Sequence, residues 1–174
     1  MSQGPSITAS TKVAALLRHY PELEEVLIAM APPFVKLRNP ILRRSVAKVA
    51  SLRQAAAVGR LPVEDMVNRL RAVVGQEPLV GDEAPAEDPY FTAQPRWYDA
   101  DRVVDSMDER DLDPDVMPLN PLLRRATKLV GTEVLELVTD YLPAPGVDIL
   151  RNKGFATWCV MRGDIVHTYI MRAP

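Results

Sequence analysis

The chain has 174 residues, which is enough for one medium-sized domain or two small ones. Its single cysteine, Cys159, excludes an intramolecular disulfide framework and a multi-cysteine metal site within this chain. The net charge of −2 is unevenly distributed, because residues 1–75 hold 11 basic and 5 acidic residues (+6) and residues 76–174 hold 10 and 18 (−8). This polarity indicates either a basic module that binds anions or two halves that attract each other, and we favour the second.

Two features bear on the cellular location. Residues 1–10 lack the basic start and the apolar core of a signal peptide. The longest mostly apolar run, Val26 to Val35, is too short to span a bilayer and contains two prolines. We therefore expect a soluble cytoplasmic protein.

The first module, residues 1–75, carries apolar side chains at helical spacing and predicts a bundle of four or five short helices. Asn39 followed by Pro40 is a typical helix start, and Ser51 can cap the next helix. Gly59 can end that helix. The expected helices cover residues 11–19, 21–30, a segment that starts at 39–40, 51–59 and 62–74.

A linker and a second module follow. Residues 76–95 contain four prolines and five acids with little apolar periodicity, which predicts an extended and mobile linker. Residues 96–174 then alternate strand and helix patterns, with expected elements at 102–107, 118–129, 132–139, 143–153, 155–161 and 165–171. The order β-α-β-α-β-β predicts a two-layer sandwich, so the whole chain is expected to be of the α+β class.

The first module also resembles a known family. Residues 6–74 contain the pieces ITASTKVAALLRHYPELEEVL and LRNPILRRSVAKVASLRQAAAVGRLPVEDMVNRL, which are similar to a helical domain of unknown function of the eighteen-fifty-eight type. The resemblance implies a context beside hemerythrin-like di-iron proteins and hybrid-cluster-type redox proteins. Some members carry cysteines in the turn after the second helix, where this chain has the residues Ala31 to Phe34. We therefore expect no thiolate-bound cluster at that turn.

The second module, over about residues 98–172, resembles the sulfur-carrier fold of TusA and SirA. The piece LVGTEVLELVTDYLPAPGVDILRNKGFATWCVMRG carries most of this resemblance, which is closest to a domain of unknown function of the twenty-two-forty-nine type. Sulfur carriers begin their first helix with a Cys-Pro pair, whereas this chain has Met117-Pro118 and Asn120-Pro121. Asn120 and Tyr141 also replace histidines of some relatives. The resemblance therefore implies neither a persulfide nor a metal here, and we expect no cofactor.

Basic residues dominate one stretch of the first module. No acid occurs from Val26 to Val63, and the basic face that we expect there comprises Arg38, Arg43, Arg44, Lys48 and Arg53. Such a face is typical of an anion or nucleic-acid site. A solvated helix face, or a docking face for the acidic half of the chain, is the alternative that we favour.

A second candidate site lies where both helices of the second module are expected to begin. Helix N-termini attract anions, so a small anionic ligand is expected near Arg110, Asn120, Arg124 and Tyr141. The alternative, which we favour, is that these helix ends are simply capped and solvated.

The terminal hairpin is apolar on both faces, although two helices can cover only one face of a four-stranded sheet. The second face is therefore expected to meet the first module, another protein or a second copy of the chain. Trp158 and Tyr169 are the residues expected at this interface, because aromatic side chains are enriched in interface cores. Cys159 and His167 are interpreted as packed strand residues, and no metal site is expected.

These observations lead to one functional hypothesis and two alternatives. The hypothesis is an accessory protein that acts as a binding or regulatory module in redox, sulfur or nitrogen-oxide metabolism, without catalytic chemistry of its own. The first alternative is a sulfur-transfer protein that uses Cys159. The second is a nucleic-acid-binding protein that uses the basic helical module.

Overall fold

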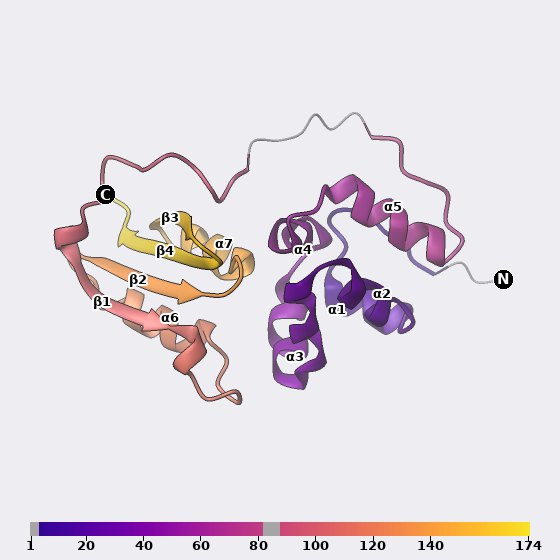
Figure 1. The fold of residues 1–174 in the computed structure, drawn as a ribbon, viewed down its shortest axis with the longest axis horizontal. Helices are drawn as coiled ribbons and strands as arrows, with labels where there is room; N and C mark the ends of the chain where they lie inside the picture. Colours follow the sequence, from indigo (N-terminus) through magenta and orange to yellow (C-terminus); the bar gives the residue numbers. More distant parts are fainter. Residues whose placement is uncertain (1–3, 82–87) are drawn as a thin grey trace. The chain divides into compact units, whose positions relative to one another are not determined.

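The chain folds into two compact units, Met1–Ala86 and Glu87–Pro174, in a computed structural model that describes residues 4–81 and 88–174 (Figure 1). The division falls within the segment 76–95 that the sequence predicts as a linker. Helices make up the first unit, and a mixed sheet with helices makes up the second. This arrangement confirms the predicted α+β class. Among the described residues, no helix has the length and apolarity needed to cross a membrane.

Unit 1 is a bundle of short helices. Its elements are α1 (Val13–His19), α2 (Leu23–Met30), the 3₁₀ helix η1 (Pro32–Arg38), α3 (Pro40–Val49), α4 (Leu52–Gly59) and α5 (Val63–Val73). Both predicted caps are present, because the Asn39 side chain accepts a hydrogen bond from the backbone N–H of Ile41 and Ser51 forms a capping box with Gln54. Only η1 was not predicted, since its two prolines were interpreted as the end of α2.

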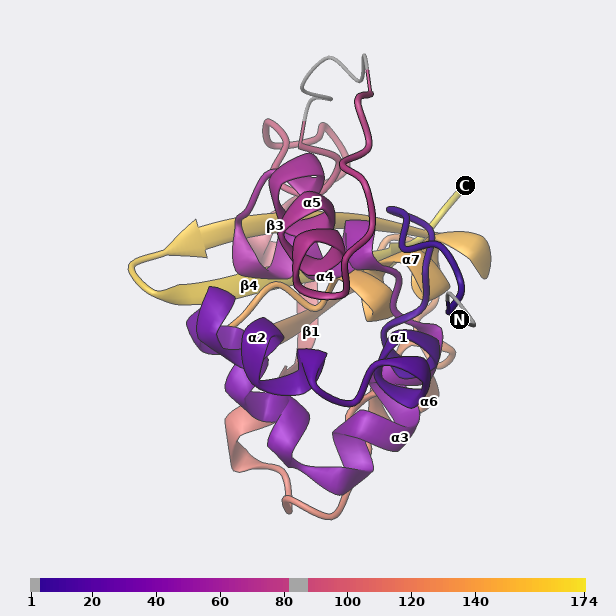
Figure 2. The same cartoon turned by 90° about the vertical axis from the view of Figure 1, so that its right-hand side faces the viewer.

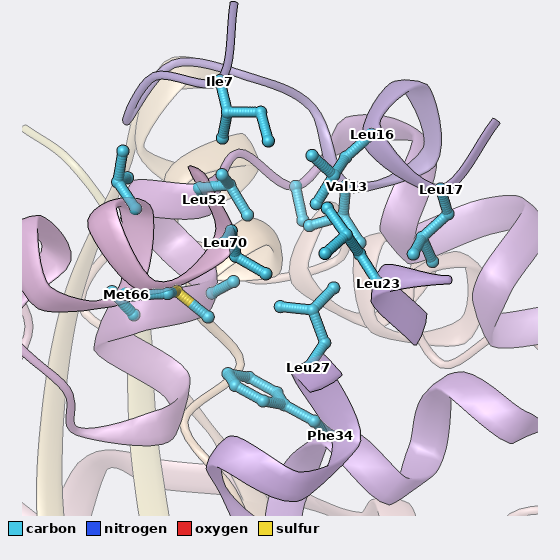
Figure 3. Packing of buried hydrophobic residues seen from close by; sticks show 14 of the residues in the cluster. Ile7, Val13, Leu16, Leu17, Leu23, Leu27, Phe34, Leu52, Met66 and Leu70 are labelled. Atoms are coloured by element: carbon cyan, nitrogen blue, oxygen red, sulfur yellow. The ribbon is translucent and has the colours of Figure 1, made fainter. Parts of the chain in front are cut away.

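The core of unit 1 draws leucines from most of its helices, including Leu16, Leu27, Leu52 and Leu70 (Figure 3). Gly59 was expected only to end a helix, but it also allows close packing against Phe34. A Cβ atom at Gly59 would lie 2.8 Å from the Phe34 ring, so only glycine allows η1 to approach α4 this closely. The left-handed residue that ends α4 is Arg60, with φ of 54°.

A buried arginine joins both ends of unit 1 to α5. Arg71 is 8% exposed, and its guanidinium donates to the backbone oxygen of Ile7 at 2.7 Å and to the backbone oxygen of Glu77. The Gln76 side chain accepts a further hydrogen bond from the backbone N–H of Ile7 at 3.0 Å. The start of the predicted linker is therefore docked rather than mobile as far as Leu79, whose backbone is bonded to the Asn68 side chain. Residues 82–87 of that linker lie outside the described residues.

This arginine gives a first testable expectation. Arg71→Met should lower the free energy of unfolding of unit 1 by about 1–3 kcal/mol, because the substitution leaves the carbonyl of the buried Ile7 without its donor. Urea unfolding followed by circular dichroism measures the effect. Arg69→Met, at an exposed position of the same helix, is the matched control and should change little. Equal unfolding curves for both variants would contradict the structural role of Arg71.

Unit 2 contains one four-stranded sheet. Its elements are η2 (Ala100–Arg102), β1 (Val103–Asp108), η3 (Glu109–Asp111), α6 (Leu119–Ala126), β2 (Val134–Thr139), α7 (Ala144–Asn152), β3 (Phe155–Arg162) and β4 (Ile165–Arg172). The strand order is β1-β2-β4-β3, with β1 parallel to β2 and β4 antiparallel to both of its neighbours. The predicted succession β-α-β-α-β-β is therefore present, and the 3₁₀ turns η2 and η3 are additions to it.

The sheet has apolar residues on both of its faces. On one face, Leu135, Leu137 and Ile170 pack with Leu122 of α6 and Leu150 of α7. The opposite face, which we call the second face, presents a separate cluster of Val134, Trp158, Tyr169 and Met171. The hairpin is therefore apolar on both faces, as predicted. Because α6 and α7 pack on the first face, the apolar residues of the second face must be covered by another segment.

Candidate functional site

Trp97 and Tyr98 pack on the second face. They belong to residues 88–98 of the chain, a segment that we call the strap and whose start contacts α7. Figure 1 shows this segment running alongside β3 and β4 before the chain enters β1. At its start, the Tyr90 hydroxyl donates to Asp148 of α7 at 2.8 Å. Farther along, the backbone oxygen of Thr92 accepts a hydrogen bond from the Trp158 indole at 3.0 Å. Its last residue, Tyr98, lies against the aromatic side chains of the sheet.

These aromatic rings form a closely packed group. The Tyr98 ring centroid lies 4.7 Å from that of Trp158 and 4.4 Å from that of Tyr169. Trp158 and Tyr169, which are paired across β3 and β4, lie 5.5 Å apart in a stacked arrangement. Aromatic pairs at these separations contribute about 0.5–1.5 kcal/mol beyond the area that they bury. Tyr98, together with Trp97, therefore provides apolar contact between the strap and the sheet.

The strap changes the interpretation of Trp158 and Tyr169. The sequence predicts both as interface residues, but Trp158 is 6% exposed and Tyr169 is 2% exposed. Their cover comes from residues that the sequence assigns to the mobile linker and to the first turn after it. While the strap is in place, these two rings offer little surface to a partner, and an interface at these residues stays a prediction.

A polar cluster lies beside the aromatic rings on the second face. The Glu136 carboxylate of β2 accepts hydrogen bonds from Ser106 of β1 at 3.0 Å and from Tyr169 of β4 at 3.1 Å. It also contacts Nδ1 of His167 at 2.8 Å. The strand register explains this gathering, because Ser106, Glu136 and Tyr169 lie in one row across three strands. We call Glu136, Ser106, His167 and Tyr169 the Glu136 cluster.

The electrostatics of the cluster favour an ionised carboxylate. Burial raises the pKa of Glu136, but the hydrogen bonds from His167, Ser106 and Tyr169 together outweigh burial and lower it below its ordinary value. Burial, with help from Tyr98 and Glu136, raises the pKa of the Tyr169 phenol. The contact of Nδ1 with the Glu136 carboxylate orients the imidazole ring of His167. Because three donors already occupy the carboxylate, it is suited to positioning other groups rather than to taking a proton.

The lowered pKa of Glu136 predicts how the stability of unit 2 depends on pH. Since the folded-state pKa lies below the unfolded value of about 4.3, the contribution is fully present above that value and is lost as pH falls through the folded pKa. Glu136→Gln should lower the free energy of unfolding at pH 7 by about 1–3 kcal/mol, and this difference should shrink below pH 4. Urea unfolding at several pH values measures it, with Asp164→Asn in the exposed hairpin turn as control. A difference that does not depend on pH would contradict the assignment.

Cys159 lies on the helix-covered face and is enclosed. The residue is 1% exposed, and its sulfur lies 3.5 Å from the Thr168 hydroxyl oxygen. Burial raises the pKa of the thiol, and the contact with Thr168 only partly offsets this effect. A thiol with a raised pKa and little access to solvent is a poor nucleophile. The interpretation of Cys159 as a packed strand residue agrees with this geometry.

Two of the four residues of the expected anion site, Arg110 and Tyr141, are paired with acids. The Arg110 guanidinium donates to Asp108 at 2.8 Å, and this bond lowers the pKa of the Asp108 carboxyl. The Tyr141 hydroxyl donates to the carboxylate of Glu109 at 2.7 Å and 2.9 Å. Asn120 and Arg124 are exposed on α6. Carboxylates therefore occupy two of the expected anion ligands, which argues against an anion site at this place.

Part of the expected basic face is neutralised by the preceding helix. Arg43 forms an ion pair with Glu24 at 2.6 Å, and Arg38 pairs with Glu25 at 3.2 Å. Both acids belong to α2. The stretch from Val26 to Val63 contains no acid in the sequence, but in the folded chain acids from α2 lie beside two of its arginines. Arg44 and Lys48 are exposed one turn apart on α3, and Arg53 is exposed on α4.

The comparisons with known proteins bear on unit 1. Residues 7–67 match the model of a family described as Domain of unknown function (DUF1858). This match confirms the resemblance of the N-terminal helices over most of its expected extent. Neither the curated proteins nor the solved structures gave a match.

The sequence did not reveal the Glu136 cluster, because its members lie on three strands and are separated by about thirty residues. One signal could have indicated it. Glu136 is a charged residue inside an otherwise apolar strand, and such a residue usually has a partner. Identifying that partner requires the strand order and register, which local patterns do not supply.

Proposed function

We propose that the chain is an accessory binding protein without catalytic chemistry of its own, and that unit 1 binds an acidic partner protein through α3. The observation that carries this proposal is the exposure of α3. Of its ten residues only Ala47 is buried, and in both views α3 lies on the side of unit 1 away from α5 (Figures 1 and 2). A helix that leaves most of its surface uncovered is suited to contact another molecule.

The side chains on α3 suggest the chemistry of the partner. Arg44 and Lys48 lie one turn apart, and Val49 beside them is 41% exposed. Ile41, one turn before Arg44, is only half-buried. We call Ile41, Arg44, Lys48 and Val49 the α3 stripe. Cations beside apolar side chains fit an acidic surface that also offers apolar contact. Opposite charges speed the association of the two proteins, and burial of apolar surface stabilises the complex once it has formed.

Nucleic acid is the less favoured partner. Nucleic-acid binding relies on several cations that neutralise phosphates, and its affinity falls steeply with salt. Two of the basic residues in the acid-free stretch, Arg38 and Arg43, are already paired with carboxylates of α2. The exposed valine and the half-buried isoleucine of the α3 stripe would gain little from a phosphate backbone.

Charge reversal tests this proposal. Immobilised wild-type chain should capture acidic proteins from a lysate of the native host, and Arg44→Glu/Lys48→Glu should lose most of them because each new carboxylate repels the acidic surface. Quantitative mass spectrometry of the captured proteins is the measurement. Arg18→Glu/Arg69→Glu reverses two exposed charges elsewhere in unit 1 and should retain the partners.

The same variants separate the two kinds of partner. Labelled double-stranded DNA should bind the wild-type chain weakly and without a marked difference between the two double variants. Strong DNA binding that weakens with salt and is lost only on Arg44→Glu/Lys48→Glu would replace the protein-partner proposal with the nucleic-acid alternative. Retention of the same captured proteins by that variant would contradict the role of the α3 stripe.

The proposed context is redox, sulfur or nitrogen-oxide metabolism in the cytoplasm. It is supported by the resemblance of unit 1 to the DUF1858 family and by the contexts which that resemblance implies. We also propose that unit 2 is a relative of the TusA/SirA fold, of the twenty-two-forty-nine type, because it has the β-α-β-α-β-β order. Its function would differ from that of a sulfur carrier, since Met117 and Asn120 stand where the carrier cysteine is expected.

Sulfur transfer by Cys159 is the alternative that this geometry disfavours. Incubation with a cysteine desulfurase and cysteine should give no persulfide, which mass spectrometry would detect as a gain of about 32 Da. Iodoacetamide should also alkylate Cys159 at least about tenfold more slowly in the folded chain than in the urea-unfolded chain, which is the internal control. A stable sulfur adduct on Cys159 in the folded chain would support the sulfur-transfer alternative instead.

A further inference from the structure

We infer that the second face of the sheet in unit 2 is a binding face for an extended, aromatic-bearing peptide, and that the strap covers this face as a displaceable substitute for that peptide. The inference concerns unit 2 and does not depend on the α3 stripe of unit 1. Its evidence is the way in which the strap is held, the composition of the face beneath it, and the chemistry of the three contacts between them.

The strap is held by a few side-chain anchors and not by a strand ladder. Residues 92–95 form neither helix nor strand, and the pairs of β3 are all with β4. The anchors are the bond from Tyr90 to Asp148, the bond from Trp158 to the Thr92 backbone oxygen, and the packing of Tyr98. Arg151 adds a contact at 5.5 Å from the centre of the Tyr90 ring.

Much of the strap between these anchors is exposed to solvent. The side chains of Thr92, Ala93, Gln94 and Arg96 are all exposed. A segment that is held by side-chain contacts toward its two ends and by no backbone ladder opens at a lower free energy than the sheet beneath it. The strap can therefore leave the second face without unfolding unit 2, provided that another group covers the face.

The face beneath the strap has the composition of an interface core. Trp158, Tyr169 and Met171 lie together there with Val134, and Arg162 of β3 lies 5.9 Å from the centre of the Tyr169 ring. Tryptophan, tyrosine, methionine and arginine are the residue types that are enriched in interface cores. Opening of the strap would expose this cluster to water, which is unfavourable unless a ligand replaces the strap.

The three anchors define the chemistry of the replacement. The ligand must offer a hydroxyl or similar donor to Asp148, a backbone carbonyl to the Trp158 indole, and an aromatic ring to Trp158 and Tyr169. An extended peptide with two aromatic residues eight positions apart, as Tyr90 and Tyr98 are, meets all three requirements. Proline is tolerated between the aromatic residues, as at Pro95 of the strap, because no ladder requires its N–H.

A labelled peptide with the sequence of residues 88–98 is the probe that tests this inference. The peptide is titrated into the full-length chain, and binding is measured by fluorescence anisotropy. Wild-type chain should bind it weakly, because its own strap competes at a high effective concentration. The Tyr90→Phe/Tyr98→Ala variant should bind at least about tenfold more tightly, because its own strap competes less well.

Two controls make the result specific. The same peptide carrying alanine in place of both tyrosines should not bind. Tyr141→Phe removes a comparable tyrosine hydrogen bond, that to Glu109, away from the strap and should leave the affinity for the peptide at the wild-type value. Circular dichroism and urea unfolding establish that each variant is folded before it is titrated.

A folded Tyr90→Phe/Tyr98→Ala variant that binds the peptide no more tightly than the wild-type chain would overturn the inference. If the double variant does not fold, Tyr90→Phe alone loosens one anchor and provides the same comparison with Tyr141→Phe. Equal affinities for these two single variants would also overturn the inference, and tighter binding by Tyr90→Phe would support it.

Discussion

The constraint on which unit 2 depends is a sheet that is apolar on two faces and has helices for only one of them. α6 and α7 pack on Leu135, Leu137 and Ile170, which leaves Trp158 and Tyr169 to be covered from elsewhere. Exposed together, two such rings would favour association or aggregation. The strap covers these two rings with residues of the same chain. Trp158 and Tyr169, which suggested an external partner, are therefore buried without one.

Local sequence signals predicted the elements well because each depends on neighbours in the chain. The Asn39 and Ser51 caps are examples. The cover of the sheet was not predictable in this way, because Tyr98 and Trp158 are sixty positions apart and no pattern links them. Gly59 shows the same limit at a smaller scale. A glycine at a helix end indicates a cap, whereas its contact with Phe34 becomes visible only once η1 is placed against α4.

Charge counted along the sequence was also an incomplete guide to charge in space. The stretch from Val26 to Val63 has no acid, yet Glu24 and Glu25 of α2 pair with two of its arginines. In unit 2, Arg110 was expected to attract an anion, but a carboxylate two residues away already binds it. Short-range pairing of this kind is frequent because a side chain meets the charges that its own turn or the next helix presents. The cations that remain exposed on α3 are therefore more informative than the net charge of +6 of the first 75 residues.

The pKa shifts of Cys159, Tyr169 and Glu136 move these groups away from the range that acid–base or nucleophilic chemistry uses. A general acid or base works best with a pKa near the working pH, and a nucleophilic thiol needs a lowered one. Burial moves the pKa of Cys159 and that of the Tyr169 phenol away from this range, upward in both cases. The hydrogen bonds to Glu136 move its pKa the other way, below its ordinary value. Each shift fixes a proton or a charge at neutral pH, so Glu136 and Tyr169 hold their part of the second face in one arrangement. A preorganised face with fixed donors and acceptors is what selective recognition of a peptide requires, because little conformational entropy is then lost on binding.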